Sequence, residues 1–307
     1  MHRRALAAAL ADRGERGFTA TVIDTSPGNR ARALLIGSRF VDVRWVDRTG
    51  STNADVIALA RHGEPEGIVV VADHQSAGRG RRDRTWEAPP GASLMATVLL
   101  RPRSAVAGMA TMAIALAAAE AVEELTGLAP RLKWPNDLVV PGDGSGHDRK
   151  LAGILAEADW PAASHIAGGW LPPATDARVV VAAGIGINVA WGDQMPEELS
   201  GSAVSLDELI APVAPPDRVD LLVAFLRRLD HHYGALRRGD GVDALRLAWE
   251  ARSASIGRRV RVDLGVDDVV GTAVALTAEG HLVVESLEGD RRTVAVGDVV
   301  HLRPEGT

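Results

Sequence analysis

The residues best suited to chemistry in this sequence form a segment in which four arginines alternate with glycine. It occupies residues 75–86 and reads Gln-Ser-Ala-Gly-Arg-Gly-Arg-Arg-Asp-Arg-Thr-Trp; we call it the glycine–arginine loop. So many guanidinium groups cannot be buried in a core, and glycine lets backbone amides approach an anion closely. The loop therefore indicates phosphate binding, with a solvated surface loop or a nonspecific nucleic-acid contact as alternatives. Its final residue, Trp86, could stack on a purine or serve only in packing.

Lysine is almost absent from the chain, because Lys133 and Lys150 are the only two among 34 basic residues. An ammonium is a compact point charge, so lysine in an arginine-rich chain indicates places where a guanidinium fork would not fit. Lys133 opens the motif Lys-Trp-Pro-Asn-Asp, and Lys150 opens Lys-Leu-Ala-Gly-Ile-Leu. A hairpin between these motifs would bring Lys150, Asn136 and Asp137 into one pocket. Alone, the first motif could be a strand-entry turn whose Asn and Asp satisfy local backbone groups.

Composition sets limits on the class of protein. The chain has 307 residues, 46% of them hydrophobic, a net charge of −6 and no cysteine. The length favours about two domains, and the acidic balance provides no global attraction for nucleic acid or an anionic membrane. Without cysteine, disulfides, thiolate chemistry and Cys-type zinc sites are excluded. The longest apolar stretch, residues 105–119, is too short to span a bilayer, and the N-terminus makes a poor signal peptide, so we expect a cytoplasmic protein.

Hydrophobic periodicity predicts the elements that must position these motifs. The expected strands cover residues 40–46, 67–72, 93–100, 138–140 and 179–189. The expected helices run from residue 51 or 52 to 60, over 104–125 and within 217–250, with Ser51 or Thr52 as the first N-cap. Residues 74–91 form a long loop, and hairpin tips are expected at 141–146 and 168–175. The first 40 residues read as an extension with a short helix over 4–13 and a polar turn at 26–29.

The pattern changes near residue 256, where short alternating strands are expected. They cover residues 257–262, 269–276, 281–286 and 293–302. This indicates a small β-barrel of about 50 residues that follows an α+β core. We therefore divide the chain into an N-terminal extension (1–40), a catalytic domain (41–254) and a C-terminal barrel (255–307). No residue of the barrel stands out as functional.

Five motifs taken together are far more specific than any one of them. In chain order they are Thr49-Gly50-Ser51-Thr52-Asn53, the glycine–arginine loop, Lys133-Trp134-Pro135-Asn136-Asp137, Lys150 with Gly153-Ile154-Leu155, and Gly184-Ile185-Gly186-Ile187-Asn188. From about residue 45 to residue 303 the chain closely resembles the biotin protein ligases. The resemblance implies an α+β fold, with a mixed-sheet core of the biotin/lipoate ligase type and a C-terminal SH3-like barrel. The residues before the core are too few for the DNA-binding domain of the repressor members and lack a helix-turn-helix pattern, which favours the monofunctional branch.

For such a ligase the resemblance implies two steps. Biotin and ATP, with Mg²⁺, give biotinyl-5′-AMP and pyrophosphate, and a lysine of a biotin carboxyl carrier domain of an acyl-CoA carboxylase then takes the biotinyl group. One alternative is a lipoate or octanoate–protein ligase of the same superfamily, which the glycine–arginine loop and the Lys133 motif disfavour. The other is a biotin-sensing DNA-binding repressor, which the acidic charge disfavours. We expect neither nucleic acid nor membrane as a partner, and the sequence leaves the oligomeric state open.

The resemblance also implies roles for individual residues. The biotin-contacting positions are matched by Ser51, Thr52, Asn53, Gln75, Arg79, Gly80, Arg81 and Lys150. The nucleotide-side positions are matched by Arg84, Trp86, Asn136 and Asn188. Lys150, Asp137 and Arg81 are the expected catalytic residues: Lys150 between the biotin carboxylate and the reacting phosphate, Asp137 where the acceptor amine arrives, and Arg81 in the loop that closes over both. The metal ligands are not identified.

Two features depart from the family pattern. Asp83 stands where the loop usually has glycine, which adds a negative charge and restricts the backbone angle φ. A Gly/Asp-rich insertion at 141–149 lengthens the hairpin before Lys150, so it bears on the register of that lysine.

Overall fold

Seven strands form one mixed sheet at the centre of the computed structural model, which describes residues 25–141, 148–160, 165–166, 169–170, 173–265, 267–295 and 297–302. The strand order is β1-β2-β3-β9-β6-β5-β4, and only the β1–β2 pair among these neighbours is parallel. The strands are β1 (Val43–Thr49), β2 (Val69–Gln75), β3 (Ser93–Leu100), β4 (Arg131–Lys133), β5 (Asp137–Val140), β6 (Arg149–Asp159) and β9 (Val180–Asn188). A separate two-stranded pair consists of β7 (His165–Ile166) and β8 (Gly169–Trp170).

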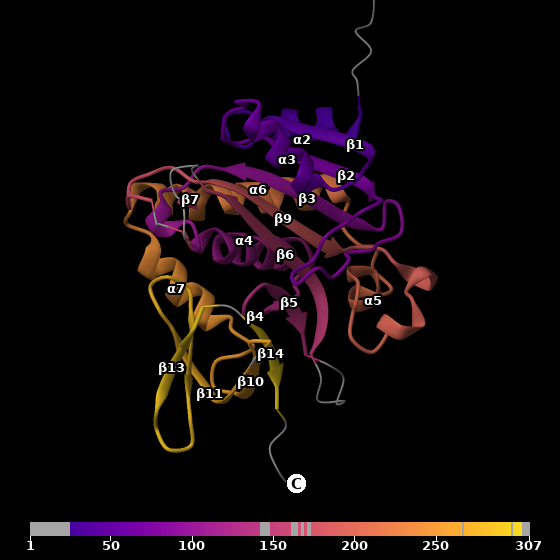
Figure 1. Cartoon of the computed structure of the whole chain (residues 1–307). Coiled ribbons are helices and arrows are strands. Elements are labelled where there is room, and N and C mark those ends of the chain that lie inside the picture. The colour runs from indigo at the N-terminus through magenta and orange to yellow at the C-terminus, as the bar shows by residue number, and fades with distance from the viewer. Residues whose placement is uncertain are drawn as a thin grey trace, which may run out of the picture.

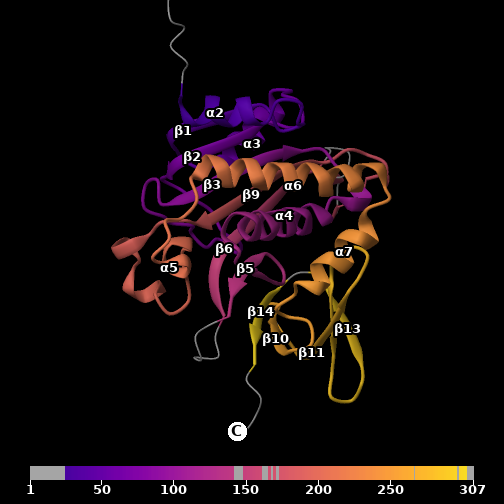
Figure 2. The ribbon, with the colours of Figure 1, turned by 180° about the vertical axis from the view of Figure 1, so that it is seen from behind.

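Helices cover both faces of this sheet (Figures 1 and 2). Helices α4 (Met109–Thr126) and α6 (Arg218–Arg238) lie side by side in front of the sheet in Figure 2. Helix α3 (Thr52–Arg61) packs on the opposite face. Successive side chains of β2 point to opposite faces of the sheet. Val69 and Val71 therefore join the main core, whereas Val70 packs with residues of α3. Helix α4 is apolar almost all round, as expected for a buried helix.

The helical region predicted at 217–250 consists of two helices. Gly239 adopts a left-handed conformation, with φ of 89°, and ends α6. Helix α7 (Val242–Ala251) follows and leads the chain away from the sheet. Shorter helical turns, which the sequence did not predict separately, complete the core: η1 (Ser104–Val106), η3 (Gly192–Gln194), η4 (Glu197–Leu199) and α5 (Leu206–Ile210). In the described part of the chain, no helix is long and apolar enough to cross a membrane.

The polar turn predicted at 26–29 is wrong, because these residues start helix α2 (Pro27–Leu34). Ser-Pro-Gly-Asn is typical of turns, but proline also fits the first helical turn, where its missing N–H costs no hydrogen bond. Ala31, Leu35 and Phe40 are fully buried against the main core. Tertiary packing therefore decides the conformation of this segment. The helix predicted over 4–13 lies outside the described residues, and the division of the chain at residues 40 and 254 stays a prediction.

Five antiparallel strands form the C-terminal SH3-like barrel, in the order β13-β12-β11-β10-β14. They are β10 (Arg259–Asp263), β11 (Asp268–Leu276), β12 (Leu282–Glu285), β13 (Arg291–Val294) and β14 (Asp298–His301). The single strand predicted over 293–302 is therefore two strands. Gly297, with φ of 150°, precedes β14, which returns across the sheet to pair with β10. This topology brings the start of β14 toward the core.

The barrel docks on the core through a small polar network around His301. The indole of Trp134 donates to the carbonyl of Gly280 at 3.0 Å, and the His301 ring contacts Ser255, Arg258 and Asp148 at 3.1–3.2 Å. Burial lowers the pKa of His301 to about 4, and the charges of Lys133 and Arg258 act in the same direction. Asp148 opposes this shift, but the ring is still neutral near neutral pH.

This burial predicts a specific pH dependence of folding. The pKa of His301 is about 4 in the folded protein and about 6.5 when unfolded, so between these values the unfolded chain binds the proton more strongly. The free energy of unfolding should therefore fall as pH drops from about 6.5 to about 4. Urea unfolding of His301→Gln should show a smaller decline across this window than the wild type. The exposed residue His62 supplies the control, because His62→Gln should leave the decline unchanged; equal slopes in all three proteins would contradict the role of His301.

Candidate active site

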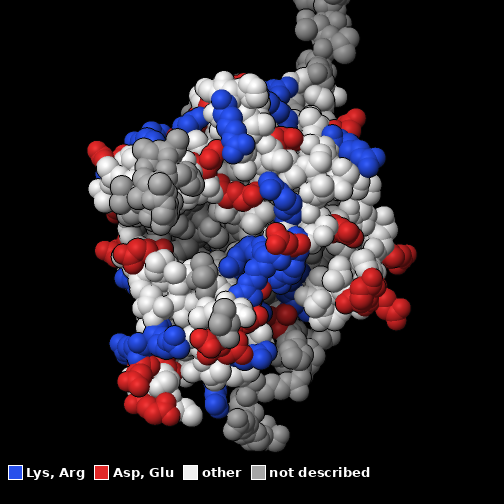
Figure 3. Space-filling view, viewed as in Figure 1, with Lys and Arg blue, Asp and Glu red and all other residues white. Residues whose placement is uncertain are grey.

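An open cavity lies between the sheet and the C-terminal barrel. Strands β6 and β9, the glycine–arginine loop, the turn before β5 and the start of β14 all contribute to it. It is lined by Ser51, Thr52, Asn53, Gln75, Arg79, Gly80, Arg81, Arg84, Thr85, Trp86, Thr97, Lys133, Trp134, Pro135, Asn136, Asp137, Lys150, Gly153, Ile154, Leu155, Gly184, Ile185, Gly186, Asp298 and Val299. Lys and Arg side chains gather near the middle of this face of the molecule (Figure 3).

Three glycines form a floor on which a flat ring can lie. A Cβ at Gly186 would be 2.5 Å from Cε2 of Trp86, and a Cβ at Gly153 would be 2.9 Å from the same indole and from Lys150. A Cβ at Gly184 would be 2.1 Å from Oδ1 of Asn53. The close approach of these side chains to β6 and β9 therefore requires glycine at these positions. The indole also lies near a cation, since Nζ of Lys150 is 5.5 Å from its ring centroid.

The start of α3 forms a buried polar wall. The Oε1 atom of Gln75 accepts a hydrogen bond from the Thr52 amide at 2.8 Å. The Thr52 and Thr97 hydroxyls are 2.7 Å apart, and Thr97 donates to Oδ1 of Asn53 at 2.7 Å. Ser51 occupies the predicted N-cap position of α3, although its side chain makes no capping hydrogen bond. Buried polar groups in one connected network are held rigidly, which suits a site that fixes a polar ligand.

Opposite this wall, a lysine and a carboxylate form an ion pair. Nζ of Lys150 is 2.7 Å from Oδ1 of Asp137, and both side chains are partly exposed to the cavity. Pairing of β5 with β6 sets Asp137 opposite Gly153 and Val139 opposite Lys150, with an irregularity after Leu138. The hairpin thus brings the two motifs together, and the insertion at 141–149 does not carry Lys150 away from them. All of the predicted tip (141–146) except its first residue lies outside the described part of the chain.

The glycine–arginine loop crosses the mouth of the cavity. Arg79 pairs with Glu157 at 2.9 Å, and one nitrogen of Arg81 lies 3.2 Å from Oδ1 of Asn136. Burial lowers the pKa of the Arg81 guanidinium from its usual value, while the nearby carboxylates Asp298 and Asp137 oppose that shift. The group stays protonated, since arginine does not lose its charge in proteins.

Asp83 adopts the conformation that glycine usually supplies at this position of the loop. Its φ is 57°, and that of Arg82 is 53°, both in the left-handed region. Aspartate tolerates this region better than most residues, because its short polar side chain can interact locally. The departure from the family pattern is therefore compatible with the loop conformation.

The structure separates one predicted residue from the others. Asn188 does not line the cavity: its side-chain amide is buried and donates to the carbonyl of Val204 at 3.1 Å and of Lys150 at 3.5 Å. Its contact with a nucleotide stays a prediction. Several cavity residues were missed by the sequence analysis: Thr97, Asp298 and Val299. Thr97 sits inside an apolar strand and the other two follow the last turn of the barrel, so no local motif marked them.

Comparisons with known proteins cover most of the chain. Residues 45–164 match the Biotin/lipoate A/B protein ligase family, and residues 255–302 match the Biotin protein ligase C terminal domain. Biotin–[acetyl-CoA-carboxylase] ligase of Mycobacterium tuberculosis is 38% identical over 89% of this chain and 94% of its own length. Bifunctional ligase/repressor BirA of Bacillus subtilis is 31% identical over 80% of this chain and 70% of its own length. The Aquifex aeolicus biotin protein ligase in complex with biotin and ATP superposes with a TM-score of 0.67 at 25% identity, covering 86% of this chain and all of that one.

The glycine floor gives a prediction about Gly186. Its replacement by alanine should displace the Trp86 indole and lower the free energy of unfolding by about 1–3 kcal/mol, as for other overpacked sites. Gly201→Ala is the control, because nothing lies within 4 Å of a Cβ there. Urea unfolding of Gly186→Ala in a Trp86→Ala background should show little loss. The same loss in both backgrounds would mean that the indole is not the group displaced.

Proposed function

The chain belongs to the biotin protein ligase family, and on this premise we propose which of its residues carry each step of the reaction. The protein is an ATP-dependent ligase that activates biotin as biotinyl-5′-AMP and transfers the biotinyl group to a biotin carboxyl carrier substrate. The observation that supports our assignment best is the 2.7 Å ion pair of Lys150 with Asp137, inside a cavity that also holds Arg81 and Arg84.

The first step joins two anions, so it needs cations at the reacting centre. A biotin carboxylate oxygen attacks the α-phosphorus of ATP, the bond to the bridging oxygen breaks, and pyrophosphate leaves. We assign Lys150 to the space between carboxylate and phosphate, where a point charge stabilises the negative charge of the transition state. Arg79, Gly80 and Arg81 also line the cavity, and we assign the two guanidinium groups to the biotin carboxylate and the phosphates. Holding both reactants in line supplies a further part of the acceleration.

The polar wall suits the neutral, ring-bearing end of biotin. A ureido group both donates and accepts hydrogen bonds, and Ser51, Thr52, Asn53 and Gln75 offer both kinds of partner around one end of the cavity. We therefore propose that the ureido group faces α3 and that the carboxylate points toward Lys150.

The nucleotide would occupy the other end, where Arg84, Trp86 and Asn136 lie. Arg84 suits a phosphate, and the indole offers an aromatic face to the adenine. Asn188, buried behind Lys150, would act on the nucleotide only through the backbone of that lysine. ATP enters with Mg²⁺, which usually binds phosphates, water and one or two carboxylates. Among the described residues, no group of three or more His, Cys, Asp or Glu side chains is placed to hold a metal ion. We propose that the ion arrives as MgATP, bound mainly by the phosphates.

The second step requires an uncharged amine. Once the anionic intermediate draws Lys150 toward its phosphate, Asp137 loses its partner and can accept a proton from the incoming lysine ammonium. The amine then attacks the acyl carbon, an amide bond forms, and AMP leaves. We further propose that the acceptor is the carrier domain of a cytoplasmic acyl-CoA carboxylase, in keeping with the name of the M. tuberculosis relative.

The direct test is to incubate the protein with biotin, MgATP and a biotin carboxyl carrier domain and to measure the intact mass of the carrier. We expect an increase equal to one biotinyl group, lost when ATP is omitted. Lipoate or octanoate in place of biotin should give no such product. Modification by lipoate but not by biotin would favour the lipoate or octanoate–protein ligase, the alternative from the same superfamily.

The two half-reactions separate the roles of Lys150 and Asp137. Lys150→Ala should reduce pyrophosphate release by about 10²–10³-fold, the usual effect of removing one charge-stabilising group. Asp137→Asn should slow transfer from preformed adenylate by about 10²-fold or more and slow adenylation less. Pyrophosphate release by Lys150→Ala at the wild-type rate would refute its role. Equal losses in both half-reactions for Asp137→Asn would refute acceptor activation.

A further inference from the structure

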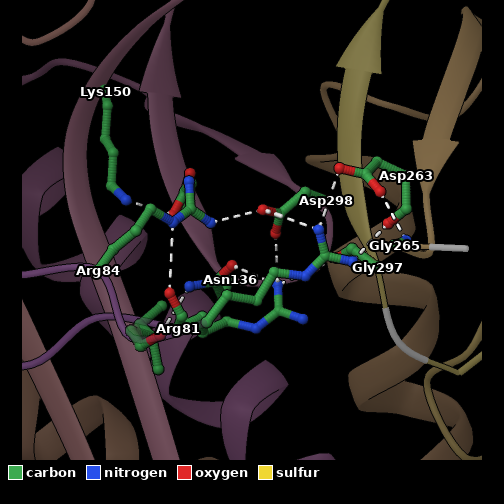
Figure 4. Close-up of polar contacts among 11 residues, drawn as sticks. Arg81, Arg84, Asn136, Lys150, Asp263, Gly265, Gly297 and Asp298 are labelled. Atoms are coloured by element: carbon green, nitrogen blue, oxygen red, sulfur yellow. Dashed lines mark hydrogen bonds and ion pairs between the residues drawn. The ribbon is translucent and has the colours of Figure 1, made fainter.

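One carboxylate of the C-terminal barrel lies beside three arginines of the glycine–arginine loop (Figure 4). Oδ2 of Asp298 is 2.6 Å from Arg84, and Oδ1 is 3.3 Å from Arg81. Arg82 is also within 3.7 Å of this carboxylate. Asp298 is 26% exposed and Arg81 22%, so their pair is less screened than one on an open surface, whereas Arg84 is 63% exposed.

The contacts of Arg81 and Arg82 extend this tie between loop and barrel. The nitrogen of Arg81 that contacts Asp298 also donates to the carbonyl of Gly297 at 3.1 Å and to Asn136 at 3.2 Å. Arg82 donates to the carboxylate of Asp263 at 3.1 Å and to its carbonyl at 2.7 Å. The loop is thus bound to two strands of the barrel. Asn136 also links the Arg81 guanidinium to the core.

The chain conformation before β14 places this carboxylate. A Cβ at Gly297 would be 2.6 Å from Cγ1 of Val262, so a side chain there would push β14 away from β10. Glycine at this position lets the carbonyl of Gly297 and the carboxylate of Asp298 face the loop together. Both groups accept hydrogen bonds from Arg81, and the carboxylate also lines the cavity.

We propose that Asp298 is a positioning residue for the ligase reaction: it holds Arg81 and Arg84 across the cavity mouth, so that the barrel keeps the loop closed over the acyl-adenylate. This rests on the function proposed above. Three guanidinium groups repel one another, and a carboxylate among them offsets that repulsion, whereas an amide of the same shape would not. Without the charge, the arginines separate and the loop opens more often.

An open loop has a definite chemical consequence. The intermediate is a mixed anhydride of a carboxylic acid and a phosphate, which water attacks unless the site excludes it. Because residues of the loop line the cavity in which the intermediate forms, loss of the tie should increase escape more than it slows adenylate formation. The retention of adenylate therefore reports on Asp298 more directly than the overall rate does.

The test is to form the adenylate in full-length protein with biotin and MgATP, without carrier, and to follow its release by rapid filtration. Asp298→Asn should release it about tenfold faster than the wild type, a factor that corresponds to about 1.4 kcal/mol. Asp298→Glu, which keeps the charge, should restore much of the retention. The matched control is Asp268→Asn, which removes an ion pair with Arg261 elsewhere on the same barrel and should release adenylate at the wild-type rate.

A purely structural effect is separable from positioning. The variant Asp298→Asn should unfold in urea at nearly the same midpoint as Asp268→Asn. If it does not fold, Arg82→Gln serves instead, because Arg82 pairs with Asp263 and Asp298 but does not line the cavity, and its loss should also speed release. In the double variant Arg84→Gln/Asp298→Asn, the increase in release should be smaller than the product of the two single effects, because Asp298 holds Arg81 as well.

Each outcome of these measurements either supports or contradicts the proposed role of Asp298. Release by Asp298→Asn at the wild-type rate, or additive effects in the double variant, would overturn the role of Asp298. A wild type that forms no adenylate at all would instead contradict the function proposed above. The two failures are therefore distinguishable in one series of measurements.

Discussion

A site that brings two anions together must first hold several cations close to one another, and those cations repel. In the structure this repulsion is offset by acidic side chains from other elements. Arg79 pairs with Glu157, Arg84 with Asp298 and Lys150 with Asp137, each within 3 Å. A ligand carboxylate or phosphate at Lys150 would thus replace one counterion by another, so this cation stays paired in the partly buried cavity.

The fold determines where these charged side chains lie, because they come from separate parts of the chain. Strand β6 supplies Glu157 and Lys150, β5 supplies Asp137, and β14 of the barrel supplies Asp298. The position of each charge therefore depends on sheet register and on the docking of the barrel. The buried contacts at Trp134 and His301 help to fix that docking, so the packing of the barrel on the core also determines the geometry of the loop arginines.

Local motifs predicted much of this, and their limits have physical causes. The lysine motifs and the glycine–arginine loop were recognisable because their residue types fit no ordinary core or surface, and they do lie around one cavity. Helix α2 was mistaken for a turn because Ser-Pro-Gly-Asn satisfies both, and only the burial of Leu35 and Phe40 decides between them. Asp298 was missed because its importance comes from long-range pairing with Arg84, 214 positions away in the chain.

The backbone geometry explains why the insertion at 141–149 and the aspartate at position 83 are compatible with the site. The pairing of β5 with β6, from Val140 with Arg149 to Asp137 with Gly153, sets the register of Lys150 whatever the length of the sequence that joins the two strands. Asp83 replaces a glycine but adopts the left-handed backbone that glycine would have supplied. In both cases the backbone path at the cavity is retained. What the family pattern preserves here is the position of charges, and several local sequences can supply that position.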